Sequence, residues 1–272
     1  LRDLIIGSEG TLAFVTKAIL RLLPKPTKDV SLLVPFPTLK DAIGTVPAII
    51  RAKAIPTAIE FMEREVLVDS EEYLGRPFPD KSSDAYLLLK FDGSSLQEIE
   101  GAYDSVAKVC LEHGALDLFI ADTEERSTPI WKSRGAFLEA IKGSTTEMDE
   151  VDVVVPRSHV NEFVEYVHGL QKELNIRIKS FGHAGDGNLH VYILRDDMDD
   201  KKWKEMLNKA MELMYAHAKE LDGQVSGEHG IGLAKHPYLK DSLDPEAIAL
   251  MNRIKKAFDP KNILNPHKVC QD

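Results

Sequence analysis

Cysteine is scarce in this chain, and long apolar runs are missing. Its 272 residues include only two cysteines, Cys110 and Cys270, and no Cys-x-x-Cys pair. We therefore expect neither a disulfide framework nor a thiolate metal site, and we expect a reducing, cytoplasmic location. Apolar stretches such as 151–155 are strand-sized, far below the ~20 residues that span a bilayer, and the start shows no signal peptide. We therefore expect no transmembrane segment.

Negatively charged residues outnumber positively charged ones. Lys and Arg total 34 against 44 Asp and Glu, which leaves a net charge of −10. A nucleic-acid backbone requires a basic face, so we expect no nucleic-acid partner. The apolar and charged fractions are those of an ordinary globular protein. The length suits one large domain or one and a half smaller ones. The opening, Leu1-Arg2-Asp3-Leu4, lacks a methionine and reads like the middle of a longer protein.

A strand–helix–strand pattern occurs three times along the chain. The predicted ranges are 30–35, 39–52 and 58–61, then 85–91, 96–113 and 116–120, then 151–155, 158–174 and 176–181. Such units predict an α+β domain built on ferredoxin-like repeats, with a mostly antiparallel sheet covered by helices on one face. A doubly wound parallel sheet is the alternative. Two further amphipathic helices are expected at 201–221 and 245–258.

The first 27 residues follow a different pattern. Residues 4–6 are expected to form a short strand that leads into a turn. Residues 12–20 are expected to form apolar structure after that turn. Pro24 and Pro26 then mark a linker. A turn of this composition presents backbone N–H groups that suit an anionic phosphate, although the motif alone is weak. Its residues are Gly7, Ser8, Glu9, Gly10 and Thr11.

The most informative stretch is a turn flanked by histidines. Asp186-Gly187 is a hairpin signal between two strand-like runs, 177–183 and 189–194. Residues opposite each other across a hairpin share a face, so this turn would bring His183 and His190 to one side of the sheet. Two imidazoles with an acidic third ligand suit a divalent metal. A chance pairing of loop histidines is the alternative that these residues leave open.

A second stretch places an acid and a histidine side by side among glycines, in the sequence Gly227-Glu228-His229-Gly230. Glycine permits the close backbone approach and unusual φ angles that sites often require. Glu228 is a candidate carboxylate ligand and His229 a candidate acid/base group. A flexible loop after the long helix is the alternative when this motif is read alone.

Four motifs in this order resemble the FAD-linked oxidase C-terminal domain family of vanillyl-alcohol-oxidase-type flavoproteins. Its members include glycolate oxidase catalytic subunits, D-lactate dehydrogenases and D-2-hydroxyglutarate dehydrogenases. The segments 183–190 and 227–230 resemble the paired signature of that domain. Residues 6–12 resemble the end of the family's FAD-binding domain, and 258–266 resemble its usual C-terminus.

The resemblance implies a division of the chain into three parts. Residues 1–27 would be the end of a PCMH-type FAD-binding domain, and 28–258 a substrate- and metal-binding cap domain. Residues 259–272 would return to the flavin side. Most of the FAD-binding domain would then precede Leu1, so we expect the chain alone to hold FAD poorly.

The resemblance also implies the cofactors and their ligands. His183, His190 and Glu228 would bind a divalent metal. Zinc or iron is the first expectation, and manganese and cobalt are alternatives. FAD would be contacted by Gly7, Ser8, Glu9, Gly10, Thr11, Val15 and Asn265. His229 would be the catalytic base, and Arg134 would grip the substrate carboxylate with its guanidinium fork. A surface ion pair is the alternative for Arg134.

The implied reaction is oxidation of a small D-2-hydroxy acid to the 2-oxo acid, with hydride transfer to flavin N5. In the 2-hydroxyglutarate branch, further polar groups hold a second carboxylate. In this chain Leu138 and an acidic run around Glu150 take the place of those polar groups. This favours a small monocarboxylate, D-lactate or glycolate. An electron-transfer flavoprotein or other oxidase subunits are possible partners, through which the protein could associate with a membrane. A non-catalytic subunit of a flavin oxidase complex and a metallohydrolase are the alternative functions.

Overall fold

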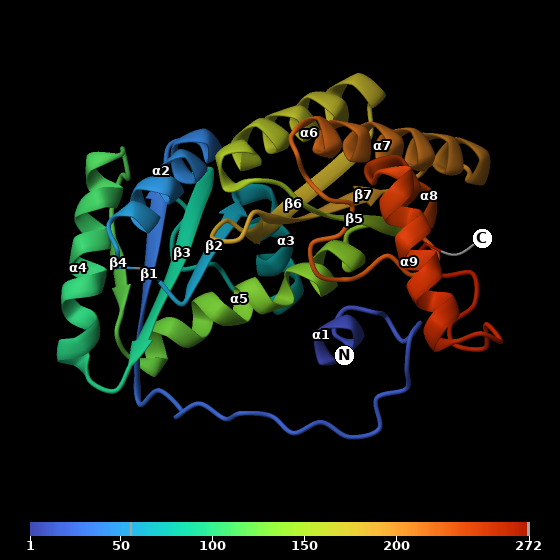
Figure 1. Cartoon of the computed structure of the whole chain (residues 1–272). Coiled ribbons are helices and arrows are strands. Elements are labelled where there is room, and N and C mark those ends of the chain that lie inside the picture. Colours follow the sequence, from blue (N-terminus) through green and yellow to red (C-terminus); the bar gives the residue numbers. More distant parts are fainter. Residues whose placement is uncertain (55, 271–272) are drawn as a thin grey trace.

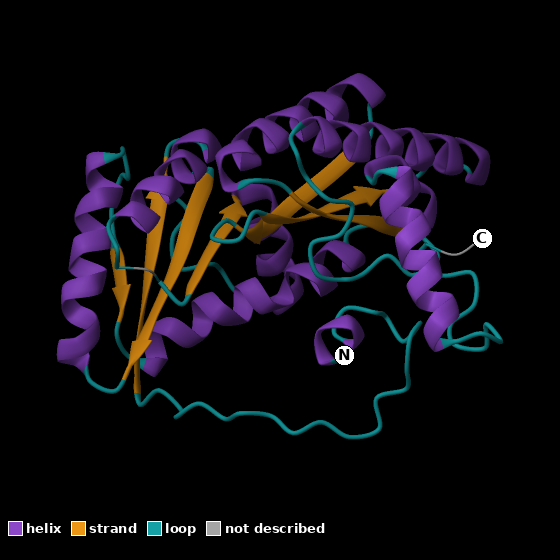
Figure 2. Cartoon of the chain, viewed as in Figure 1, coloured by secondary structure: helices purple, strands orange, loops and turns teal. Residues whose placement is uncertain are grey.

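A computed structural model describes residues 1–54 and 56–270, which form one seven-stranded sheet with helices on both faces (Figures 1 and 2). The strands are β1 Lys28–Phe36, β2 Ala58–Glu63, β3 Ala85–Gly93, β4 Phe119–Ala121, β5 Met148–Val154, β6 Arg177–His183 and β7 Asn188–Leu194. The helices are α1 Arg2–Ile5, α2 Leu39–Arg51, α3 Arg64–Leu74, α4 Leu96–Glu112, α5 Glu124–Gly143, α6 Val160–Leu174, α7 Asp200–Glu220, α8 His236–Ser242 and α9 Pro245–Phe258. None of the described helices is long and apolar enough to cross a membrane.

The strand order is β4-β1-β3-β2-β6-β7-β5, and all of the neighbouring strands run antiparallel. The β4-β1-β3-β2 half, with α2 and α4, is one ferredoxin-like repeat. The β6-β7-β5 half, with α6 and α7, is a second repeat. Its fourth strand is reduced, in the described chain, to a single bridge between Val154 and Gln224. The antiparallel α+β sheet is confirmed, and the parallel alternative is wrong.

Helices pack on both faces of the sheet, so the prediction of a single covered face is wrong. Strand β1 shows why, because Leu32 belongs to the core beneath α2, α4, α6 and α7, whereas its neighbour Leu33 belongs to the core beneath α3 and α5. A strand that is apolar on both sides needs cover on both. Helix α5 was not predicted, since its buried positions include Ser133 and Ala140 and give a weak apolar pattern.

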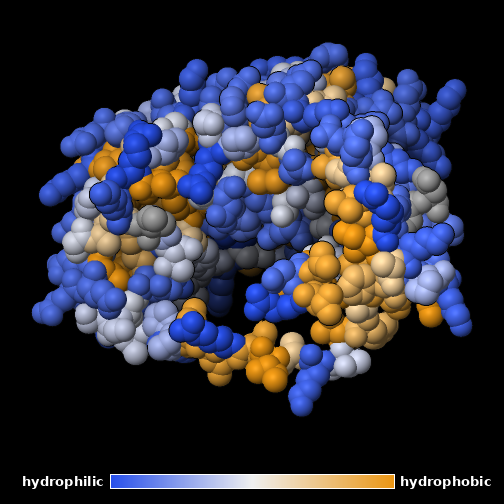
Figure 3. Space-filling model, in the orientation of Figure 1, coloured by the Kyte–Doolittle hydropathy of each residue, from blue (hydrophilic) through white to orange (hydrophobic). Residues whose placement is uncertain are grey.

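The N-terminal segment departs from the predicted pattern. The strand expected at 4–6 is wrong, because Arg2–Ile5 is a short helix. Residues 13–26 form neither helix nor strand and run as an extended loop beneath the domain (Figure 1). A strand needs a neighbouring strand to accept and donate its backbone hydrogen bonds, and this segment has none beside it in the described part of the chain. The apolar pattern alone therefore gives a wrong prediction here. Phe14 and Ile19 are 85% and 95% exposed. Figure 3 shows apolar surface along the lower part of the view, where this loop runs in Figure 1.

The two ends of the chain are held together by buried polar contacts. Glu9 accepts hydrogen bonds from the amides of Ile231 (2.8 Å) and Gly232 (2.7 Å), which ties the N-terminal turn to the 225–232 loop. The buried Lys255 ammonium group donates to the carbonyl of Thr11 (2.8 Å) and to the Asp259 carboxylate (2.6 Å). Lys255 therefore anchors the turn to helix α9 and to the segment that follows it.

This anchor predicts an acid-sensitive contribution to stability. The hydrogen bond from Lys255 holds the pKa of Asp259 at about 2, below its ordinary value. A carboxyl group with a lowered folded-state pKa stabilises the fold above its unfolded pKa of about 4, and this contribution is lost as the pH falls through 2. Asp259→Asn should therefore lower the melting temperature at pH 6 but much less at pH 2. The exposed Asp244→Asn is the control, and an unchanged difference at both pH values would contradict the prediction.

Candidate functional site

The two histidines of the hairpin lie on one face of the sheet, although not directly opposite each other. In the register of β6 and β7, His183 pairs with Asn188 and His190 pairs with Phe181. Paired residues and residues two apart along a strand share a face, so both imidazoles project to the same side. Their ring centroids are 5.3 Å apart. The hairpin turn thus brings the histidines together as a diagonal pair.

Glu228 completes a cluster of potential metal ligands with these histidines. Its Oε1 atom lies 3.2 Å from Nε2 of His190 and 3.6 Å from Nε2 of His183. One ligand atom from each of the three residues lies within 4.8 Å of the others. Donor atoms at this spacing can share one divalent ion, because metal–ligand bonds are about 2.0–2.2 Å long.

Each of these histidines is oriented by a carboxylate behind it. Nδ1 of His183 lies 2.7 Å from Glu60, and Nδ1 of His190 lies 3.0 Å from Glu150. Burial raises the pKa of Glu60 and of Glu150, but the hydrogen bond from each histidine and further contacts outweigh it and lower both. An ionised carboxylate only accepts hydrogen bonds, so each Nδ1 carries a proton. Each Nε2 then presents a lone pair, as metal-binding histidines do.

A buried aspartate in β5 shapes the loop that carries Glu228 and His229. Asp152 accepts hydrogen bonds from the backbone amides of Glu228 (3.2 Å) and His229 (2.9 Å), and from the Ser226 hydroxyl (2.9 Å). The Lys235 ammonium group lies 3.1 Å away. Burial raises the pKa of Asp152, but these contacts outweigh it and hold the pKa at about 2.

Arg134 lies in the same network. Its Nε and Nη2 atoms donate to one oxygen of Glu60, at 3.0 and 2.6 Å, and its guanidinium lies 4.6 Å from the centre of the Phe181 ring. With 14% of the Arg134 side chain exposed, the pair is largely buried. Glu60 therefore links Arg134 to His183. Arg134 does form an ion pair, as the alternative prediction had it, but this pair is largely buried within the site and not at the surface.

The residues expected to contact FAD also come together. Ser8, Gly10, Val15 and Asn265 line a hollow of about 510 Å³, and the Asn265 side chain donates to the carbonyl of Glu9 (2.9 Å). Gly7 and Thr11 line a smaller neighbouring hollow with Ser8, of about 190 Å³. Gly10 has a φ of +71°, and a Cβ there would lie 2.6 Å from the Asn265 amide nitrogen, so both the backbone and the Asn265 side chain favour glycine.

Sequence reasoning missed the carboxylates that support the site: Glu60, Glu150 and Asp152. One signal was available in the alternation of β5, since Glu150 and Asp152 are two apart and therefore share a face. Another was a charged residue inside the apolar strand Ala58–Glu63. Neither signal identifies a partner, because the partners lie on other strands, on helix α5 and in the loop that follows α7.

The fold and site define a class: an α+β domain, built of two ferredoxin-like repeats, with a histidine–carboxylate cluster on one sheet face. Residues 25–269 match the family described as FAD linked oxidases, C-terminal domain, and the chain belongs to this family. The resemblance inferred from the four motifs is thereby confirmed.

Curated relatives cover almost the whole chain. A D-lactate dehydrogenase of Anaerostipes hadrus is 44% identical over 99% of this chain, and the glycolate oxidase subunit GlcD of Bacillus subtilis is 37% identical over 99%. The chain spans 58% and 57% of the length of these two relatives. A crystal structure of p-cresol methylhydroxylase with substrate bound has a TM-score of 0.72 and 15% identity, covering 92% of this chain and 54% of that one. It shares the fold.

Proposed function

We propose that the protein containing this chain oxidises a small D-2-hydroxy acid, D-lactate or glycolate, with FAD and a divalent metal. The observation that carries the proposal is the convergence of His183, His190 and Glu228 within 4.8 Å. His229 stands beside them, its Nε2 atom 3.7 Å from Oε1 of Glu228. Relatives named D-lactate dehydrogenase and glycolate oxidase subunit support this choice of substrate class.

The cluster fits a divalent metal by its chemistry and by its charge. Two imidazoles and a carboxylate suit zinc or iron, with manganese and cobalt as alternatives. Four carboxylates gather here against the cations of Arg134 and Lys235: Glu60, Glu150, Asp152 and Glu228. A divalent cation would offset this negative excess and let an anionic substrate enter. When bound, it supplies Lewis-acid polarisation of the substrate hydroxyl.

The N-terminal turn and the C-terminal segment fit the FAD side of the site. The residues proposed to contact FAD are Gly7, Ser8, Glu9, Gly10, Thr11, Val15 and Asn265. All of them except Glu9 line the two hollows described above, and the Glu9 carbonyl accepts a hydrogen bond from Asn265. The exposed apolar side chains of 14–23 suit cover by the rest of an FAD-binding domain. FAD held there would supply the hydride acceptor, its N5 atom.

The chain's own residues would handle the proton and the orientation of the substrate. His229 would take the hydroxyl proton at Nε2, because its Nδ1 faces Glu150 at 3.2 Å. Arg134 would hold the substrate carboxylate through Nη1, because its two hydrogen bonds to Glu60 use Nε and Nη2. Glu60 keeps the guanidinium in place, and hydride transfer tolerates little misplacement.

The proposal predicts a preference for monocarboxylates. Leu138 offers no hydrogen bond, and Glu150 adds negative charge beside His190, so a second substrate carboxylate would be repelled. In the full-length protein, kcat/KM for D-lactate or glycolate should exceed that for D-2-hydroxyglutarate by at least about 10-fold. Stopped-flow bleaching of the flavin absorbance measures this, with L-lactate as the control. Faster bleaching by D-2-hydroxyglutarate would overturn the substrate choice.

The same measurement separates the alternative functions. A non-catalytic subunit would not bleach its flavin with any hydroxy acid, whereas the metal-binding histidines retained here favour a catalytic chain. A metallohydrolase would turn over its substrate without flavin. We also propose an electron-transfer flavoprotein or other oxidase subunits as partners, and a cytoplasmic location. These proposals rest on the resemblance to the family.

A further inference from the structure

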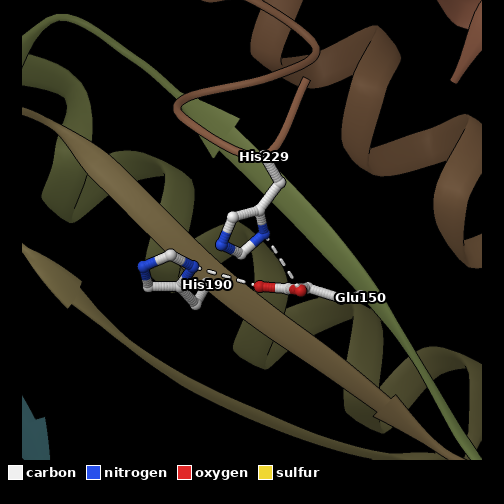
Figure 4. A group of neighbouring side chains, drawn as sticks. All are labelled: Glu150, His190 and His229. Carbon is white, nitrogen blue, oxygen red and sulfur yellow. Dashed lines mark hydrogen bonds and ion pairs between the residues drawn. The ribbon is translucent and has the colours of Figure 1, made fainter. Parts of the chain in front are cut away.

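Glu150 lies between two histidines for which different roles are proposed. Its Oε1 atom lies 3.0 Å from Nδ1 of His190 and accepts a hydrogen bond from the Tyr192 hydroxyl at 2.9 Å. Its other oxygen, Oε2, lies 3.2 Å from Nδ1 of His229 (Figure 4). One carboxylate therefore contacts a proposed metal ligand and the proposed base, which lie in different segments of the chain.

These three residues could themselves be read as a second metal site. Glu150, His190 and His229 also have ligand atoms within 4.8 Å of one another. The contacts favour hydrogen bonding instead, because the Tyr192 hydroxyl already donates to the oxygen that faces His190. Nδ1 of His190 must also stay protonated to leave its Nε2 lone pair facing Glu228, 3.2 Å away. A cation on the Glu150 side would take away that proton.

Building on the proposed function, we propose that Glu150 is a positioning residue that sets the tautomer of both His190 and His229. A carboxylate that accepts at both oxygens holds a proton on each Nδ1. Nε2 of His190 is then a free ligand atom, and Nε2 of His229 is free to receive the substrate proton. The strand register supports this role, since Glu150 pairs with Tyr192 and the neighbouring Asp152 pairs with His190.

The glutamine variant separates the two functions of this carboxylate. In Glu150→Gln, the amide oxygen can retain the two donors on its Oε1 side, from His190 and Tyr192. The amide NH₂ then faces His229 and donates to its Nδ1, which moves the ring proton to Nε2. His229 could no longer accept a proton on that side. The alanine variant, in contrast, removes the acceptor for both rings.

The test uses the full-length protein with three variants: Glu150→Gln, Glu150→Ala and, as the matched control, Asp149→Asn. Asp149 is exposed and lies next to Glu150 on the opposite face of β5. Zn²⁺ affinity is measured by competition with a chromophoric chelator, and kcat by turnover of D-lactate. Two-bond ¹H–¹⁵N spectra of the histidine rings show which nitrogen carries the proton.

Glu150→Ala should weaken Zn²⁺ binding about 10- to 100-fold and lower kcat by about 10²-fold or more. Glu150→Gln should keep Zn²⁺ affinity within about 3-fold, lose kcat as severely, and move the His229 proton to Nε2. Asp149→Asn should match the wild type. A glutamine variant with wild-type kcat, or an alanine variant with wild-type Zn²⁺ affinity, would overturn the proposal.

The experiment also keeps the two proposals apart. If the wild-type protein oxidises no D-2-hydroxy acid, the proposed function fails, but the ring spectra and Zn²⁺ affinities still test Glu150. If it does oxidise one while His190 and His229 carry their protons on Nε2, the role of Glu150 fails and the proposed function stands.

Discussion

Replacing His190 with alanine is expected to abolish both divalent-metal binding and substrate oxidation by the full-length protein. His190 belongs to both groups of potential ligands, so its removal leaves each group with only two ligands. Loss of a metal that contributes several kcal/mol to the transition state corresponds to a fall in kcat/KM of about 10³-fold or more. Metal analysis by inductively coupled plasma mass spectrometry, together with flavin bleaching by D-lactate, measures both effects.

Two further variants make this result interpretable. His190→Asn keeps an amide that can donate to Glu150 and so preserves local packing, but it lacks the ligand nitrogen facing Glu228. It should fold like the wild type and still lose metal and activity. His113→Ala removes an exposed histidine at the end of α4 and should change neither. Full activity in His190→Asn would mean that the cluster is not the active site.

Replacing Asp152 with alanine is expected to disorder the loop that carries Glu228 and His229. The Asp152 side chain is 1% exposed and accepts from both backbone amides, from Ser226 and from Lys235. Its removal leaves the largely buried Lys235 ammonium group and the amides without their acceptor. Breaking a buried pair of this kind costs about 3 kcal/mol or more in the free energy of unfolding. Urea unfolding measures this loss.

The loss of activity should exceed what the loss of stability explains. At a temperature where Asp152→Ala remains folded, kcat should still fall by about 10²-fold, because the ligand and the base would no longer face the histidines of the hairpin. Ser226→Ala removes only one of the donors to Asp152 and should give a smaller change in both quantities. If Asp152→Ala loses stability but keeps the wild-type kcat, the loop does not depend on this anchor for its active geometry.

Local patterns predicted much of the domain. Alternating and helical apolar spacing located the strands and helices of both repeats, because each of these patterns is set by residues a few positions apart. The helix expected at 245–258 coincides with α9. Long-range packing determined the rest. Small residues concealed α5, and residues 4–6 form no strand because no neighbouring strand lies beside them.

The same division applies to the candidate site. The hairpin turn and the period of two along a strand were enough to place His183 and His190 on one face, and the glycine-framed loop marked Glu228 and His229. The partners of these residues could not be predicted. Glu60 reaches His183 across 123 residues of sequence, and Glu150 reaches His190 across 40, each through a strand pairing that no local pattern specifies.

The sequence by itself therefore determined which histidines and which glutamate are candidates for the site, because turns, glycines and strand alternation act over short distances along the chain. Only the tertiary structure decided how those side chains are held. The junction of β2 with β6 and the pairing of β5 with β7 supply the carboxylates that orient the imidazoles, and the packing of α5 brings Arg134 to Glu60. Strand register and helix packing depend on contacts between distant segments, which a reading of neighbouring residues does not contain.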